Sequence, residues 1–79
     1  WKTYIKTNSE IKNVTVKHSV FNYRNFRWET KTSNIRNLRQ KNDEYYFDYI
    51  DYTSEIKVTL KSNKTITFKY VDGIYIKED

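Results

Sequence analysis

The residues best suited to chemistry in this sequence are arginines and aromatic residues that lie close together in its first half. All four arginines fall between residues 17 and 41, where seven basic residues stand against a single acid, Glu29. Arginine offers forked N–H donors that match phosphate, and aromatic rings can stack on unpaired bases. The segment 21–41 therefore predicts an anion-binding or nucleic-acid-binding surface. Its residues are Tyr23, Arg24, Phe26, Arg27, Trp28, Arg36 and Arg39.

Acidic residues gather in the next segment, residues 43–55, which holds five acids and no basic residue. Tyrosines lie among these acids, and tyrosine is enriched at protein interfaces, so the segment can form a contact patch for a basic protein. The alternative is that the acids pair across strands with the arginine block of the same chain. We prefer this second interpretation, although such surface pairs contribute only about 0–1 kcal/mol each.

Catalysis is poorly supported by the residue types. The chain has no cysteine, one glycine and one histidine, and it lacks a serine in a glycine-flanked elbow or a phosphate-binding loop. His18 shares the alternation of Val14 and Val16, which favours a structural histidine, and no second histidine or cysteine completes a zinc site. The sequence therefore predicts no enzyme, no metal and no cofactor.

The clearest signal for the fold is an alternation of apolar and polar residues from residue 55 to residue 77. A period of two with β-branched and aromatic residues indicates half-buried strands. The apolar positions are Ile56, Val58, Leu60, Ile66, Phe68, Tyr70, Ile74 and Ile76. Turn signals at Ser62-Asn63 and Asp72-Gly73 divide this stretch into a meander of three strands.

Parity predicts how the strands of this meander pair. Loops of three residues, 61–63 and 71–73, keep the apolar residues on one face, with Asn63 and Gly73 in the left-handed conformation. In this register Tyr70 faces Ile74. The opposite face then consists of Lys57, Thr59, Thr67, Lys69, Tyr75 and Lys77.

The remaining chain predicts further strands, with fewer clear turn residues between them. Residues 11–20 alternate as one strand, and residues 21–32 form a second, paired to the first through a turn near Asn22 and bent near Asn25. Residues 33–44 are polar and predict a loop or one short helix, and residues 1–10 have apolar residues at helical spacing.

Residues 45–53 predict a strand with aromatic residues on both faces. We expect Ile50 and Tyr52 to join the core, which leaves Phe47 and Tyr49 beside the lysine–threonine face of the meander. This combined face is the predicted partner-binding surface. Its residues are Phe47, Tyr49, Lys57, Lys69 and Tyr75.

These elements predict an all-β fold in a single domain, residues 1–79. A chain of 79 residues buries roughly 60% of its unfolded surface, so its core is thin. We expect an antiparallel sheet or half-open barrel of five to six strands ending in the meander. The alternative is an α+β fold, with a short N-terminal helix on a curled sheet.

The functional expectation is a non-catalytic protein-interaction module, such as a phage or mobile-element inhibitor or an exported accessory domain. One alternative is a small barrel that binds single-stranded nucleic acid through residues 21–41, and another is a protomer of a homo-oligomer assembled through edge strands. The composition has the bias of an AT-rich genome, and the net charge is +5. No apolar run could span a membrane. A first residue other than Met suggests a processed protein or an excised domain, and an extracellular or cell-surface location is slightly preferred.

Overall fold

The computed structural model describes residues 1–71 and 74–78, and this part of the chain contains strands and no helix. The strands are β1 (Lys2–Lys6), β2 (Ile11–Asn22), β3 (Arg27–Asn34), β4 (Arg39–Lys41), β5 (Glu44–Asp48), β6 (Thr53–Leu60), β7 (Thr65–Val71) and β8 (Ile74–Glu78). The predicted all-β class is confirmed, with eight strands among the described residues instead of five to six. No helix in the described part is long and apolar enough to cross a membrane.

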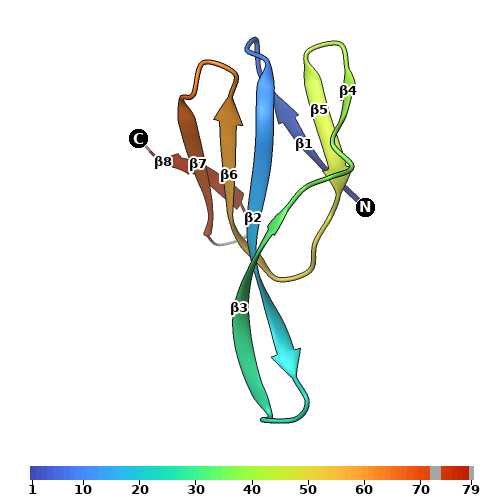
Figure 1. Ribbon diagram of the computed structural model, residues 1–79, viewed down its shortest axis with the longest axis vertical. Helices are drawn as coiled ribbons and strands as arrows, with labels where there is room; N and C mark the ends of the chain where they lie inside the picture. The colour runs from blue at the N-terminus through green and yellow to red at the C-terminus, as the bar shows by residue number, and fades with distance from the viewer. Residues whose placement is uncertain (72–73, 79) are drawn as a thin grey trace.

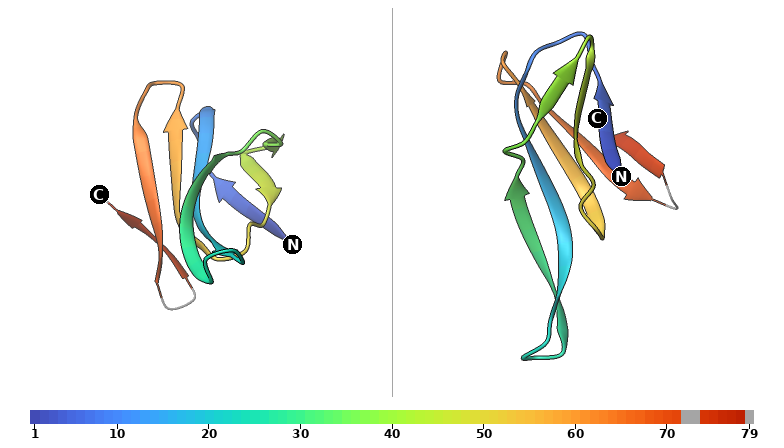
Figure 2. Two further views of the ribbon diagram at one scale, coloured as in Figure 1. Left: turned by 60° about the horizontal axis from the view of Figure 1, so that its bottom comes forward. Right: turned by 90° about the vertical axis from the view of Figure 1, so that its right-hand side faces the viewer.

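The strands form two antiparallel sheets that are not closed into a barrel (Figure 1). The small sheet has the order β1-β5-β4, and the large sheet has the order β3-β2-β6-β7-β8. The N-terminal and the 44–48 strands thus belong to a layer of their own, apart from the C-terminal meander (Figure 2).

The core lies between the two sheets. In the large sheet Val14 faces Val58 and Val16 faces Ile56 across β2 and β6, and these four side chains are at most 3% exposed. The small sheet contributes Ile5, Tyr45 and Phe47 to the same cluster. Burying a valine or isoleucine side chain stabilises a fold by about 1.5–3 kcal/mol, so this contact between sheets is the main source of stability.

The predicted loop between β6 and β7 is confirmed. Val58 faces Ile66, and the backbone N–H of Leu60 donates to the carbonyl of Lys64 at 2.9 Å, which leaves the three predicted residues 61–63 in the loop. Asn63 has φ of 69°, the left-handed conformation that the parity argument required.

The predicted register between β7 and β8 is wrong. Tyr70 faces Tyr75 and Val71 faces Ile74, so only two residues separate the strands. The predicted left-handed Gly73 lies outside the described residues. Ile76 consequently faces Lys69 and is 47% exposed, whereas Tyr75 shares the face of Tyr70. Parity decides a register only where one face is buried, and residues 75–77 of β8 are exposed.

The helices considered for residues 1–10 and 33–44 are also wrong. Residues 2–6 form the strand β1, which pairs with β5 and buries Ile5 in the core. Trp1, which a helix would have placed beside Ile5, is fully exposed. Residues 33–44 continue β3 and then form β4 and its turn, with Ile35 and Leu38 partly buried against the core. Pairing to the small sheet thus outweighs the local helical spacing, and the α+β alternative fails.

Residues 19–30 of β2 and β3 project beyond both sheets as a two-stranded arm (Figure 1). β2 pairs with β6 only as far as His18, but it pairs with β3 out to Asn22 and Arg27. Residues 23–26 form the turn, where the side-chain oxygen of Asn22 accepts from the backbone N–H of Arg24 at 2.9 Å. The predicted hairpin is confirmed, with its turn where a bend in the strand was expected.

Asn63→Ala should destabilise the fold by about 1–2 kcal/mol, because a left-handed conformation costs a residue with a Cβ this much. Asn63→Gly should leave the free energy of unfolding unchanged or raise it slightly, since glycine adopts this conformation freely. Urea unfolding followed by tryptophan fluorescence measures both, with Ser62→Ala as the control in the same loop. An equal loss for Ala and Gly would show that the Asn side chain, and not its backbone conformation, matters.

Phe47→Ala should lower the free energy of unfolding by about 3–5 kcal/mol, because the side chain is 3% exposed and its removal leaves a cavity. Tyr49→Ala, two residues away at 45% exposure, is the matched control and should cost less than about 1 kcal/mol. Comparable losses at the two positions would contradict the packing of β5.

Candidate partner-binding surface

The arm carries a cluster of aromatic side chains around Phe21. The centroid of this ring lies 5.0 Å from that of Tyr23, 6.4 Å from that of Phe26 and 5.4 Å from that of Trp28. All three contacts are edge-to-face, the arrangement that the ring quadrupoles favour. Phe21 faces Trp28 across the strands, so the hairpin register places the two rings together.

Tyr52 connects this cluster to the body of the protein. Its ring lies 4.9 Å from the ring of Trp28, and its carbonyl accepts from the backbone N–H of Ser19 at 3.2 Å. Tyr52 has φ of 61° in the loop that leads into β6. The base of the arm is therefore held by one ring contact and one backbone hydrogen bond.

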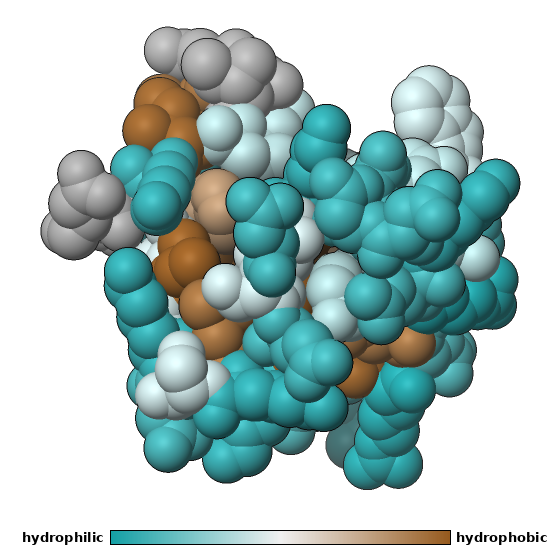
Figure 3. Space-filling model, turned by 90° about the horizontal axis from the view of Figure 1, so that it is seen from above, coloured by the Kyte–Doolittle hydropathy of each residue, from teal (hydrophilic) through white to brown (hydrophobic). Residues whose placement is uncertain are grey.

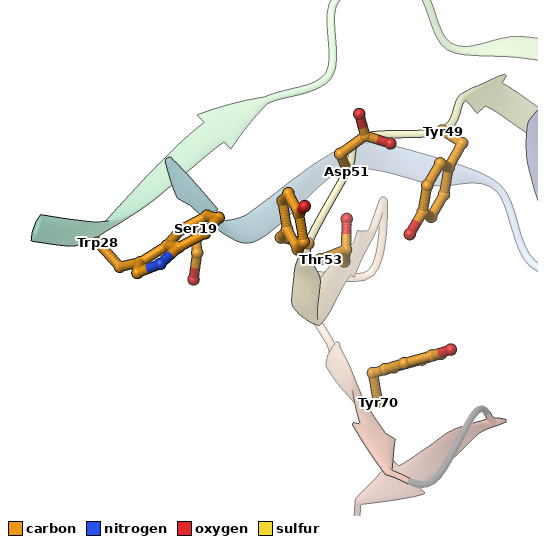
Figure 4. A pocket seen from close by; sticks show the side chains of 7 residues that line it. Ser19, Trp28, Tyr49, Asp51, Thr53 and Tyr70 are labelled. Atoms are coloured by element: carbon orange, nitrogen blue, oxygen red, sulfur yellow. The ribbon is translucent and has the colours of Figure 1, made fainter. Parts of the chain in front are cut away.

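Two open hollows meet beside Tyr52, each with a volume of about 680 Å³. In the first hollow the rings of Trp28, Tyr49 and Tyr70 stand around Asp51 and Thr53 (Figure 4). The second hollow continues along the arm past His18 and Phe21. We call the arm cluster and these hollows the aromatic surface; it comprises Phe21, Tyr23, Phe26, Trp28, Tyr49, Tyr52 and Tyr70.

The predicted partner-binding residues do not form one surface. Phe47 belongs to the core and is buried, so its assignment to an exposed partner-binding surface is wrong. Lys57 and Lys69 lie on the outer face of the large sheet, with Lys57 Nζ at 3.8 Å from Glu55 Oε1. Tyr75 lies on the opposite face of this sheet, where burial and the nearby Tyr49 raise its pKa.

The predicted anion-binding residues separate into two groups. Tyr23, Arg24 and Phe26 lie in the turn of the arm, and Arg27 and Trp28 begin β3 directly after it. Arg36 and Arg39 instead belong to the connection to β4 and to β4 itself. The guanidinium carbon of Arg39 lies 5.9 Å from the ring centroid of Tyr46, a cation–π contact on the small sheet.

The expected pairing of the acidic block with the basic block is seen only in part among the described residues: Lys17 lies opposite Glu55 and Lys41 opposite Glu44 across neighbouring strands. The ion pairs in this part of the chain join Lys2 to Asp48, Lys57 to Glu55 and Lys61 to Glu10, and none involves an arginine. The hydrogen bond from Lys2 and its charge lower the pKa of Asp48, and the charge of Arg39 helps to lower it. Glu29, the acid of the arm, accepts from the side-chain amide of Asn22 at 2.8 Å. Arg24 and Arg27 therefore keep their charge available at the tip.

His18 is half-buried and forms a hydrogen bond between its Nε2 and the Oγ of Ser33 at 2.9 Å. This contact across β2 and β3 fits the structural role that its alternation predicts. No group of three potential metal ligands occurs among the described residues.

Sequence reasoning missed Phe21, Tyr52 and Tyr70 as surface residues. Tyr52 was assigned to the core by alternation with Ile56, but it is 64% exposed. The alternation of apolar residues stops at the loop 49–52. The left-handed residue of this loop is Tyr52, and a tyrosine, unlike a glycine or an asparagine, does not indicate such a conformation in the sequence.

Comparisons of the chain with protein-family models, curated proteins and solved structures gave no match.

Burial raises the pKa of Tyr75 above its ordinary value of 10.0, and the neighbouring Tyr49 and Tyr70 raise it further, whereas the hydroxyl of Thr53 opposes them. As the pH rises, the phenol of Tyr75 therefore loses its proton at a lower pH in the unfolded chain than in the folded protein. The stability associated with the protonated phenol is present below pH 10 and is lost as the pH rises through the folded pKa.

Absorbance at 295 nm, followed to alkaline pH, should thus contain a late step above the ordinary pKa of tyrosine, and Tyr75→Phe should abolish this step. The same variant should lose less stability above pH 10. Tyr23→Phe, at the tip of the arm, is the control and should leave the late step in place. A late step that survives Tyr75→Phe would assign the shifted pKa to another tyrosine.

Proposed function

We propose that the protein is a non-catalytic interaction module that contacts a protein partner through the aromatic surface. The observation that carries this proposal is the exposure of Tyr23 (79%), Phe26 (78%) and Trp28 (56%) on an arm that leaves the core. A thin core needs its aromatic residues inside, so their presence on a projecting arm favours a role in contact.

The composition of the arm supports a protein partner. Tyrosine, tryptophan and arginine dominate the residues that contribute most to protein interfaces, and Arg24 and Arg27 flank the rings at the tip. Lys31 adds charge farther along β3. A partner with an apolar pocket for the tip and acidic residues around it would fit this surface.

Single-stranded nucleic acid is the second candidate, because the tip combines arginine with aromatic rings. The rings contact one another edge-to-face, which leaves fewer free faces for stacking bases. Asp51 also lines the aromatic surface and would repel phosphate. These contacts favour the protein partner, which is most directly tested by crosslinking.

A photo-crosslinking amino acid at Phe26 should capture a discrete protein from a lysate of the source organism, and the same group at Lys57 on the outer face should not. Trp28→Ala should reduce this capture at least tenfold, which corresponds to about 1.4 kcal/mol. Trp1→Ala, which removes another exposed tryptophan, is the matched control and should leave capture unchanged.

Treatment with nuclease distinguishes the two candidates. Capture that persists after nuclease supports the protein partner, whereas capture that disappears, together with binding of poly-dT at low salt, supports nucleic acid. Equal capture from Phe26 and Lys57 would overturn both, because neither would then use the arm.

A further inference from the structure

The strand β1 leaves one edge of the small sheet without a neighbour. Among the residues that the structure describes, β1 pairs only with β5. The carbonyl of Trp1 accepts from the N–H of Tyr49 at 3.1 Å, and the N–H of Thr7 donates to the carbonyl of Asp43 at 3.0 Å. In an antiparallel pair such bonded positions alternate.

The odd-numbered residues of β1 therefore direct their backbone groups toward β5. The N–H and C=O groups of Lys2, Tyr4 and Lys6 point away from the sheet, and no backbone hydrogen bond to them occurs in the described part of the chain.

An apolar hollow of about 200 Å³ lies directly beside this edge. Residues 3–6 of β1 form one wall, and Ile56, Phe68 and Tyr75 of the large sheet line the rest. The hollow exists because the large sheet continues through β7 and β8, whereas the small sheet ends at β1. Seen from above, hydrophobic side chains reach the surface between hydrophilic ones (Figure 3).

We propose that an extended segment of another protein adds to β1 as a further strand of the small sheet, with apolar side chains in the hollow and acidic side chains facing solvent. Unpaired backbone groups at a sheet edge form a template to which another extended strand can add in register. Side chains of such a strand alternate between its two faces, so every second residue would cover Phe68 and its neighbours.

The preference for acidic residues follows from the solvent face of β1. Lys2 and Lys6 flank Tyr4 on this face, and all three are exposed. Lys2 already forms an ion pair with Asp48 of β5, so Lys6 is the main cation that this face offers to an added strand. Opposite charges in cross-strand pairs stabilise a sheet, and like charges destabilise it. This surface lies on the sheets and not on the arm, so the inference does not depend on the aromatic surface.

A second copy of β1 fits this edge poorly. Two antiparallel copies centred on Tyr4 would place Lys2 of one opposite Lys6 of the other, and each chain carries a net charge of +5. Edge lysines are a common protection against such self-association. The charge pattern therefore favours a different, acidic strand over a dimer.

The probe for this site is a capped peptide of about seven residues in which valine and glutamate alternate. At about 1 mM it should slow hydrogen exchange of the Tyr4 and Lys6 amides at least tenfold, as followed by NMR, with little change at Thr3 and Ile5, which already bond to β5. The same peptide with lysine in place of glutamate should bind at least tenfold more weakly.

Tyr4→Pro removes an outward N–H without touching a bond to β5, and it should weaken binding of the peptide at least tenfold. Tyr4→Thr keeps the N–H and is the matched control, with an expected change of less than about threefold. Should Tyr4→Pro not fold, a peptide N-methylated at the amides that face β1 tests the same bonds in the unmodified protein and should not bind.

Unchanged exchange at Tyr4 and Lys6 with peptide present would overturn the proposal, and so would equal binding by the two Tyr4 variants. A concentration-dependent dimer that protects these amides without peptide would show that a second copy occupies the edge, which also overturns it. Analytical ultracentrifugation of the peptide-free protein detects this outcome.

Discussion

The contact between Phe47 and Tyr45 of the small sheet and the valines of β2 and β6 is the interaction on which the rest of the structure depends. The chain has no cysteine, so no disulfide supports the fold, and its buried residues form one cluster between the sheets. The hydroxyl of Tyr45 accepts from the backbone N–H of Ile11 at 3.3 Å, which satisfies its polar end inside the core. Because this cluster holds β2 in place, it also supports the arm that extends from β2.

The arm has to be stable where no second layer covers it. An isolated two-stranded hairpin is marginal in water, and edge-to-face ring contacts contribute about 0.5–1.5 kcal/mol each. The cluster around Phe21 and the contact between Trp28 and Tyr52 therefore stabilise the arm while leaving other ring surface exposed. A structural role and a binding role for these rings are compatible, since only part of each ring is used within the protein.

Much of the fold could be predicted from local patterns. The strand at residues 11–20, its pairing in a hairpin with the next strand and the three-residue loop with a left-handed Asn63 were predicted correctly, because buried alternation and turn residues act over a few positions; the turn of the hairpin lies at residues 23–26 and not near Asn22. The candidate site was predicted less well. Tyr23, Phe26 and Trp28 do lie together at the tip of the arm, but Phe47 was placed on the surface and Tyr52 in the core.

The sequence by itself determined the all-β class and the alternation of each strand that is bounded by clear turn residues. It also determined the separation of the basic segment, residues 17–41, from the acidic segment, residues 43–55. Only the tertiary structure decided which face of residues 45–53 is buried, because aromatic residues occupy both faces and the choice depends on where β5 meets β2 and β6. It likewise decided the register of β8 and the assignment of residues 2–6 to a sheet edge. These features depend on contacts between segments distant in the chain, and a local pattern carries no information about which distant surface will cover it.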